Sequence, residues 1–202
     1  MSHTVEVIVY SFFAGITVFL GGLLSRFAER FGPSPIREEF NHGAVAFGGG
    51  VLIAAVAFVL APDAIDTLAM APLVLLFLAG AFAFFLADRF IERKGGFLGQ
   101  LMALVMDFVP EAIALGATFG FDRRAGLLLA VFIGLQNLPE AFNAYVDLRR
   151  SGLSANRCLL VLLPLSFVGI AAALLGDRLL SDSPGLVASL TVSYTHLTLP
   201  TN

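Results

Sequence analysis

The sequence DFVPEA begins at Asp107, and the similar sequence QNLPEA begins at Gln136; both lie inside long apolar stretches. Residues i and i+4 share one face of a helix. Asp107 therefore points the same way as Glu111, and Gln136 likewise shares a face with Glu140. Each pair places two oxygen-bearing side chains where an apolar environment is expected.

Each copy also has a proline directly before its glutamate, at Pro110 and Pro139. Proline removes a backbone donor, so the carbonyls of Met106 and Leu135 lose their helical partners. Two helices that face each other at these positions would form a cage of oxygen atoms.

The composition places the whole chain in a membrane. The hydrophobic fraction is 58%, the charged fraction is 13% and the mean hydropathy is +0.89, which lie outside the range of ordinary soluble domains. A membrane-spanning helix needs about 20 mostly apolar residues. Six such runs are present, and they cover residues 6–25, 42–61, 71–91, 97–119, 125–146 and 158–176.

The sequence thus predicts an all-α polytopic membrane helix bundle, with six complete transmembrane helices and the start of a seventh at residues 186–192. The first span has no basic region or cleavage site of a signal peptide, so we expect it to be retained. Residues 1–192 form one transmembrane domain, which we expect to be incomplete. Residues 193–202 fit neither a helix in lipid nor the preceding composition; they resemble a translated sequencing-adapter read-through, and we expect a non-native tail.

The distribution of Arg and Lys sets the orientation. Because the loops alternate sides, nine basic residues fall on one side and three on the other. By the positive-inside rule the side with nine is cytoplasmic, so the N-terminus is outside. The nine are Arg26, Arg30, Arg37, Arg89, Arg93, Lys94, Arg149, Arg150 and Arg157; the three are Arg123, Arg124 and Arg178.

Two function classes are disfavoured. The basic residues are spread thinly along loops and form no patch interleaved with aromatic residues, which argues against a nucleic-acid partner. No Ser/His, Cys/His or His-metal constellation occurs within the spans, so we expect no enzyme activity and no cofactor. The one cysteine, Cys158, is expected to be a small apolar residue at a helix start.

Both motifs are expected at the bilayer midplane. The fourth span enters from the cytoplasmic side, so Asp107 lies ~15 Å deep in a core of ~30 Å. The fifth span descends from the outer side and brings Gln136 to the same depth. Because the two helices are antiparallel, we expect Asp107 to lie near Glu140 and Glu111 to lie near Gln136.

This arrangement predicts a metal site. A carboxylate at the bilayer centre costs at least ~2.5 kcal/mol, so three at one depth need compensation. A divalent cation supplies it, with two oxygen ligands from each helix and water to complete the shell. An all-oxygen cage selects zinc weakly, so Mn, Fe, Co or Cd could compete. The predicted ligands are Asp107, Glu111, Gln136 and Glu140.

Other polar residues extend this prediction. Asn143 and Asp147 continue the face of the fifth helix inward from the site, as a polar track. His42 is at the cytoplasmic end of the second span, where it is more often an interfacial residue than a ligand. Asp63 is expected to cap the outer end of that span, in an acidic loop that could gather cations. The glycines at 48–50 permit either a close helix contact or a local break.

The paired Pro-Glu motifs resemble those of the ZIP (Zrt/Irt-like) family of divalent metal transporters, whose fourth and fifth helices carry motifs of the form His-Asn-x-Pro-Glu and His/Gln-Asn/Asp-x-Pro-Glu. The similarity covers most of residues 6–180 and includes the stretches at 47–50, 61–63 and 172–176. It implies uptake of zinc or a related ion into the cytoplasm across the inner or plasma membrane, with the lipid bilayer as surroundings. A homodimer is a candidate assembly on the same resemblance.

The sequence departs from the family pattern at four positions. Asp107 stands where the family has histidine, as in a bacterial and archaeal branch. Phe108 replaces a ligating asparagine, and Gly169 stands where an acidic residue is frequent. These two changes weaken a second metal position, where Asn137 would be a remnant, so we expect one transported ion at a time. Val59 stands where a histidine is usual.

Two alternatives remain beside metal transport. The carboxylates could serve a proton relay in a carrier of a non-metal solute that has lost metal transport. The motifs could instead only kink helices in a membrane scaffold.

Overall fold

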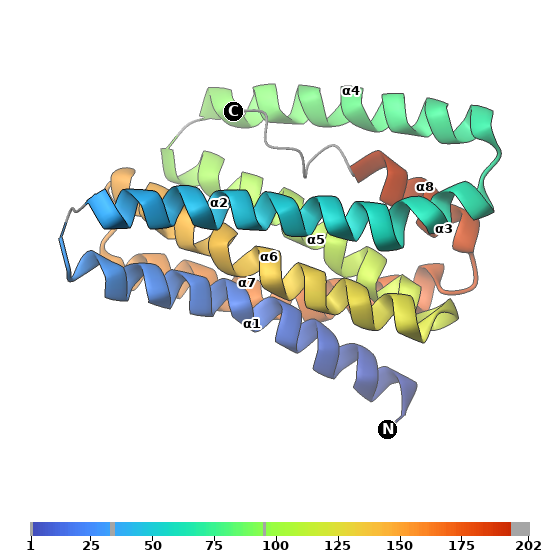
Figure 1. The fold of residues 1–202 in the computed structure, drawn as a ribbon, viewed down its shortest axis with the longest axis horizontal. Coiled ribbons are helices and arrows are strands. Elements are labelled where there is room, and N and C mark those ends of the chain that lie inside the picture. The colour runs from blue at the N-terminus through green and yellow to red at the C-terminus, as the bar shows by residue number, and fades with distance from the viewer. Residues whose placement is uncertain (1, 33–34, 95, 195–202) are drawn as a thin grey trace.

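In the computed structural model the chain is a bundle of long helices (Figure 1). The structure describes residues 2–32, 35–94 and 96–194, and no strand occurs among them, so the predicted all-α class is confirmed. The helices are α1 (His3–Glu29), α2 (Pro35–Ala55), the π-helix η1 (Val56–Leu60), α3 (Ala61–Thr67), α4 (Met70–Lys94), α5 (Gly96–Phe121), α6 (Arg123–Arg150), α7 (Ala155–Leu180) and α8 (Pro184–Tyr194).

Six segments are long and apolar enough to cross a membrane, and each contains one of the predicted spans. The protein is therefore a multi-pass membrane protein. The short apolar helix α8 corresponds to the predicted start of a seventh span. Of the tail predicted at 193–202, the first two residues continue α8, and residues 195–202 lie outside the described part of the chain.

The connections rich in arginine share one end of the bundle. Figure 1 shows the α1–α2, α4–α5 and α6–α7 connections at one end, and the N-terminus at the other. We call the first end the inner end, because the positive-inside rule assigns it to the cytoplasm. The fold thus agrees with the alternation from which the orientation was predicted.

The second span differs from the prediction at its outer end. Helical structure does not stop near Asp63 but continues through η1 and α3 to Thr67. In η1 the Ala61 backbone N–H donates to the Val56 carbonyl, five residues earlier, and Pro62 follows with no N–H of its own. A π turn directly before a proline lets the helix continue although a regular hydrogen bond is lost. Asp63 therefore lies within a helix and does not cap one.

Small residues bring α1 close to two other helices. A side chain at Gly15 would collide with the backbone of Ser166 in α7, and one at Gly21 would collide with the backbone of Leu138 in α6. Such close approach increases van der Waals contact where lipid provides no hydrophobic driving force. The glycines of the first span therefore serve packing, as the sequence indicated.

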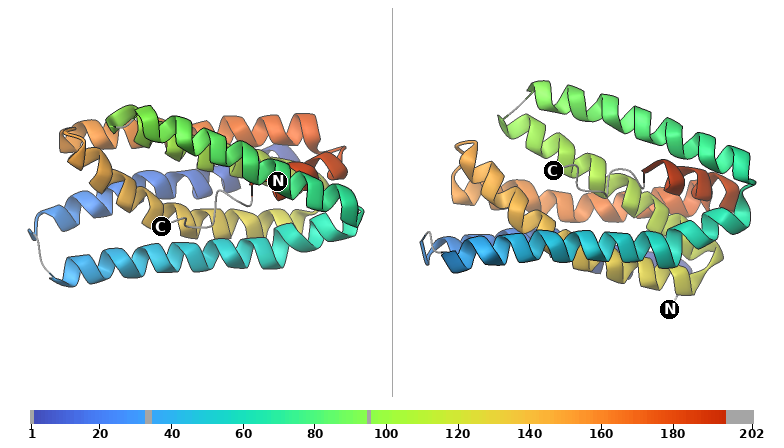
Figure 2. Two further views of the ribbon diagram at one scale, coloured as in Figure 1. Left: turned by 90° about the horizontal axis from the view of Figure 1, so that it is seen from above. Right: turned by 45° about the horizontal axis from the view of Figure 1, so that its top comes forward.

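Helix α4 lies at the margin of the bundle (Figure 2). Only 6% of its most apolar 18-residue window is buried, and exposed residues such as Leu75, Phe82 and Phe85 cover it. It packs mainly against α8 and α5. This agrees with the lipid-facing role that its uniform apolar sequence predicts.

The contact between α5 and α7 provides a test of the packing. A Cβ at Gly116 would overlap the backbone of Ala173, which cannot move aside as a flexible side chain could. We expect Gly116→Ala to lower the free energy of unfolding by about 1–3 kcal/mol. Thermal unfolding in detergent would measure this change.

Gly49→Ala is the matched control, because no atom lies within 4 Å of a Cβ at Gly49. We expect this variant to unfold at the same temperature as the native protein or slightly above it. Equal melting temperatures for the two variants would contradict the packing described here.

Candidate functional site

Helices α5 and α6 bring the two Pro-Glu motifs together in the predicted pairs. The Gln136 Nε2 atom donates a hydrogen bond to Glu111 Oε1. Glu140 lies close to Asp107 and within electrostatic range of Glu111. The antiparallel geometry inferred from depth in the membrane is therefore confirmed for both pairs.

The outer pair is buried more deeply than the inner pair. Glu111 is 5% exposed and Gln136 is 3% exposed, whereas Asp107 and Glu140 are half-buried. Glu111 Oε2 is also buried, and it has no hydrogen-bond partner among the described residues. A buried polar atom left without a partner costs about 1–3 kcal/mol. This oxygen is the strongest indication in the site that a ligand is to be bound.

A small cavity adjoins the outer pair. Its volume is about 10 Å³, and its wall includes Glu111, Gln136, Val56 and Leu60. This is the space of roughly one water molecule. The two apolar side chains come from the ends of the π-helix η1, so the irregular part of the second span borders the same cavity as the Glu111 carboxylate. π-Helices occur frequently at functional sites.

The glycine run at 48–50 makes a close contact and no break. A Cβ at Gly48 would lie 3.2 Å from the Cγ atom of Pro139, whereas no atom lies within 4 Å of a Cβ at Gly49 or Gly50. Helix α2 continues through the run. The absence of a side chain at Gly48 thus lets α2 lie directly on the motif of α6.

The site is not assembled as a metal cage in this conformation. Within the described part of the chain, no group of three His, Cys, Asp or Glu side chains has the spacing to hold a metal ion. Of the four predicted ligands, Gln136 is hydrogen-bonded to Glu111, and Asp107 lies close to Glu140.

The residues next to the motifs have structural contacts. Asn137 is buried, and its Nδ2 atom donates to the Ala14 carbonyl of α1 at 2.9 Å. The Phe108 ring lies against Gly169 of α7, where a Cβ would overlap it. Phe108 and Gly169 both depart from the ZIP pattern, and they pack against each other. The phenyl ring occupies the space that the glycine leaves.

The predicted polar track leads from the site to the inner end of α6. Asn143 is half-buried, and the Asp147 side chain is 40% exposed, with an oxygen 3.5 Å from Arg150. Exposure therefore rises from Gln136 toward the inner end. His42 is exposed in the first part of α2, and the side chain of Asp63 lies outside the described residues.

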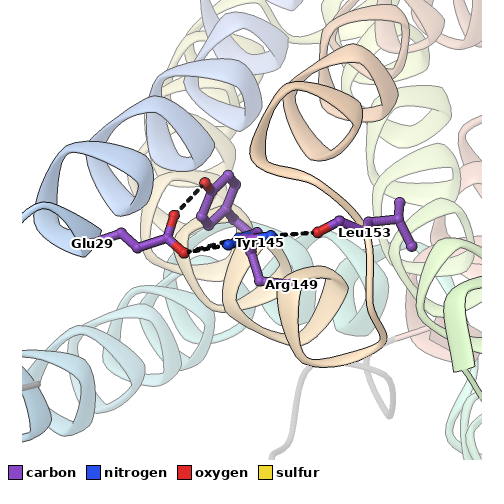
Figure 3. Close-up of polar contacts among 4 residues, drawn as sticks. All are labelled: Glu29, Tyr145, Arg149 and Leu153. Atoms are coloured by element: carbon purple, nitrogen blue, oxygen red, sulfur yellow. Dashed lines mark hydrogen bonds and ion pairs between the residues drawn. The ribbon is translucent and has the colours of Figure 1, made fainter. Parts of the chain in front are cut away.

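A second polar cluster at the inner end was not recognised in the sequence (Figure 3). Tyr145 is buried and donates from its hydroxyl to Glu29 Oε2 at 2.8 Å, while Arg149 Nε donates to Glu29 Oε1 at 2.9 Å. Arg149 also donates to the Leu153 carbonyl at 2.6 Å. The i, i+4 spacing of Tyr145 and Arg149 indicates only that the two side chains share one face of α6. Their common partner, Glu29, is 116 residues from Tyr145, so the sequence pattern does not connect them.

Polar contacts connect α1 to α6 at three levels. The inner cluster is one, and the Asn137–Ala14 hydrogen bond is the second. Near the outer end, Arg123 pairs with Glu6 at 2.8 Å. Since α6 carries Gln136 and Glu140, α1 fixes the position of half of the candidate site. Tyr145 and Arg149 lie on the opposite face of α6 from the polar track.

No protein-family model matches this chain, and no curated protein matches its sequence. The resemblance to the ZIP family therefore stays a prediction from the two motifs.

The Gln136–Glu111 hydrogen bond provides a test of the site that needs no ligand. Gln136→Leu removes the donor and leaves the buried carboxyl unpaired, so we expect a loss of about 1–3 kcal/mol in unfolding free energy. Glu111→Leu is expected to have a similar effect on the amide. The double variant should be close to the native protein, because replacing both partners removes the unsatisfied group. Unfolding titrations in detergent would show this non-additivity; additive losses would contradict the pairing.

The inner cluster is tested by Glu29→Ala. The variant leaves the buried Tyr145 hydroxyl and the Arg149 guanidinium without their shared acceptor. Because Glu29 is one-third exposed, we expect a modest loss of about 1–2 kcal/mol. Glu39→Ala is the control, since Glu39 is exposed and has no ion pair among the described residues. Equal melting temperatures for the two variants would show that the cluster does not stabilise the α1–α6 contact.

Proposed function

We propose that the protein transports a divalent metal ion, with zinc as the leading candidate, through the site formed by Asp107, Glu111, Gln136 and Glu140. The observation that carries this proposal is the buried, unpartnered Glu111 Oε2 atom, in a group of three carboxyls and one amide from two facing helices. Iron, manganese, cobalt and cadmium are alternative substrates, because the ligands are all oxygens.

Metal binding requires the Gln136–Glu111 pair to rearrange. The Gln136 amide donates from nitrogen, so it must turn to offer its oxygen to a cation. Carboxylates bind a metal ion in their deprotonated form, so any proton held at Asp107, Glu111 or Glu140 would be released when a +2 ion binds.

The surroundings support movement of the ion toward the cytoplasm. Val56 and Leu60 lie over the outer pair, and the small cavity beside them has no room for a hydrated ion. On the inner side, Asn143 and Asp147 continue the polar face of α6 with rising exposure. Access from outside would require η1 to move relative to the carboxylates, as in alternating access. With the arginine-rich end in the cytoplasm, we place the protein in the inner or plasma membrane.

One observation favours a second candidate function. Asp107 and Glu140 bring two half-buried carboxyls close together within the helix bundle, an arrangement that a proton relay uses. A carrier that couples proton movement to a non-metal solute would use the same pair. It would leave the Glu111 oxygen without an assigned role, so we rank it second.

The proposal is tested by uptake into vesicles that contain the purified chain. We expect saturable uptake of Zn²⁺, and of Mn²⁺, Fe²⁺ or Cd²⁺ with lower preference. The uptake rate should fall at least about tenfold in Glu111→Ala/Glu140→Ala, because this variant lacks half of the proposed metal ligands. Micromolar metal should also raise the melting temperature of the native protein but not that of the variant.

Glu39→Ala/Asp182→Ala is the matched control, because it removes two exposed carboxylates, one near each end of the bundle. It should retain native uptake and the metal-dependent rise in melting temperature. Absence of uptake together with absence of a metal-dependent shift in the native protein would overturn metal transport. Proton movement without metal would then favour the relay.

A further inference from the structure

A groove of about 400 Å³ lies at the inner end of α1, away from the candidate site. Its walls include apolar side chains and two guanidinium groups, from Leu23, Leu24, Arg26, Phe27 and Arg30. The volume is in the range of small-molecule binding sites.

The groove residues form one face of the helix. Leu23, Arg26, Phe27 and Arg30 follow the i, i+3, i+4, i+7 spacing that aligns side chains on a helix. Leu23 is 43% exposed and Phe27 is 56% exposed, so the apolar wall is open to the bilayer. Arg26 and Arg30 lie on either side of Phe27 along the last turns of the span, where we expect hydrocarbon to give way to the headgroup region. The face therefore presents apolar and cationic groups together at this boundary.

The two guanidinium groups lack an acidic partner among the described residues. Glu29, the acid beside them on α1, is held by Tyr145 and Arg149 on another face of the helix. Arg26 and Arg30 make no ion pair with any acid whose side chain the structure describes. Among the described residues, therefore, no acid competes with an external anion for their donors.

We propose that this groove binds an anionic glycerophospholipid of the inner leaflet. The lipid phosphate would accept hydrogen bonds from Arg26 and Arg30, which one helical turn separates, and an acyl chain would lie along Leu23, Leu24 and Phe27. Arginine suits this role because its planar fork matches phosphate oxygens. Basic pockets on the cytoplasmic side of membrane helices bind lipid headgroups in this way. The site is independent of the proposed metal transport.

Charge decides between lipid classes. A zwitterionic lipid brings a cationic group next to two arginines, whereas a phosphatidylglycerol headgroup adds a net negative charge and no cation. The apolar wall decides between lipid and free phosphate, because inorganic phosphate leaves Leu23 and Phe27 without a partner.

The test measures lipid binding by the full-length chain in nanodiscs or detergent, by native mass spectrometry. Phosphatidylglycerol is titrated against phosphatidylcholine of the same chain length. We expect preferential retention of phosphatidylglycerol, and a reduction of about thirtyfold in its affinity in Arg26→Gln/Arg30→Gln, since each of the two basic groups near the surface contributes ~1 kcal/mol. Phe27→Ala should weaken both lipids, because it shortens the acyl-chain wall.

Arg124→Gln/Arg178→Gln is the control, because it removes two exposed basic residues at the outer end and changes the net charge equally. It should bind phosphatidylglycerol as the native protein does. Equal losses in the two double variants, or equal retention of the two lipids by the native protein, would overturn the proposal. Competition by millimolar inorganic phosphate as effective as that by phosphatidylglycerol would also overturn it, since it would show an ion site only. Melting temperatures of all variants would verify that they are folded.

Discussion

Three carboxyl groups in the middle of an apolar helix bundle are the constraint on which the rest of the structure depends. Each is costly in lipid unless a partner satisfies it. The chain meets this cost by placing Glu111 against Gln136 and Asp107 against Glu140, and both pairings require α5 and α6 to face each other at one depth. The remaining helices pack around α5 and α6 and hold them in register. Glu111 Oε2 has no hydrogen-bond partner among the described residues and is left for an external ligand.

The position of α6 is set from its other face by α1. Close backbone contact at Gly21 and polar contacts at both ends and in the middle join the two helices. Van der Waals contact alone is weakly directional in lipid, so hydrogen bonds and ion pairs determine the register. In the same way Phe108 and Gly169 fit each other between α5 and α7. A site composed of four side chains is therefore supported by packing on every side.

Much of the site was predictable, because the period of a helix and the thickness of a bilayer are both known. Depth and antiparallel direction together predict that Asp107 lies beside Glu140. The end of the second span was placed too early, because a π-helix before Pro62 keeps the chain helical. The Glu29–Tyr145–Arg149 cluster was missed, because its members are far apart in the sequence and each resembles an ordinary residue near a helix end.

The sequence by itself determined that this protein has six helices long and apolar enough to span a membrane, which end is rich in arginine, and which four polar residues lie at matching positions of two antiparallel helices. These properties depend on composition and on periodicity within single helices. Only the tertiary structure decided that Gln136 is hydrogen-bonded to Glu111, that η1 borders the cavity beside Glu111, and that Asn137 binds the Ala14 carbonyl of α1. The reason is that such contacts depend on how separate helices rotate and approach one another, and small residues on both partners set that geometry.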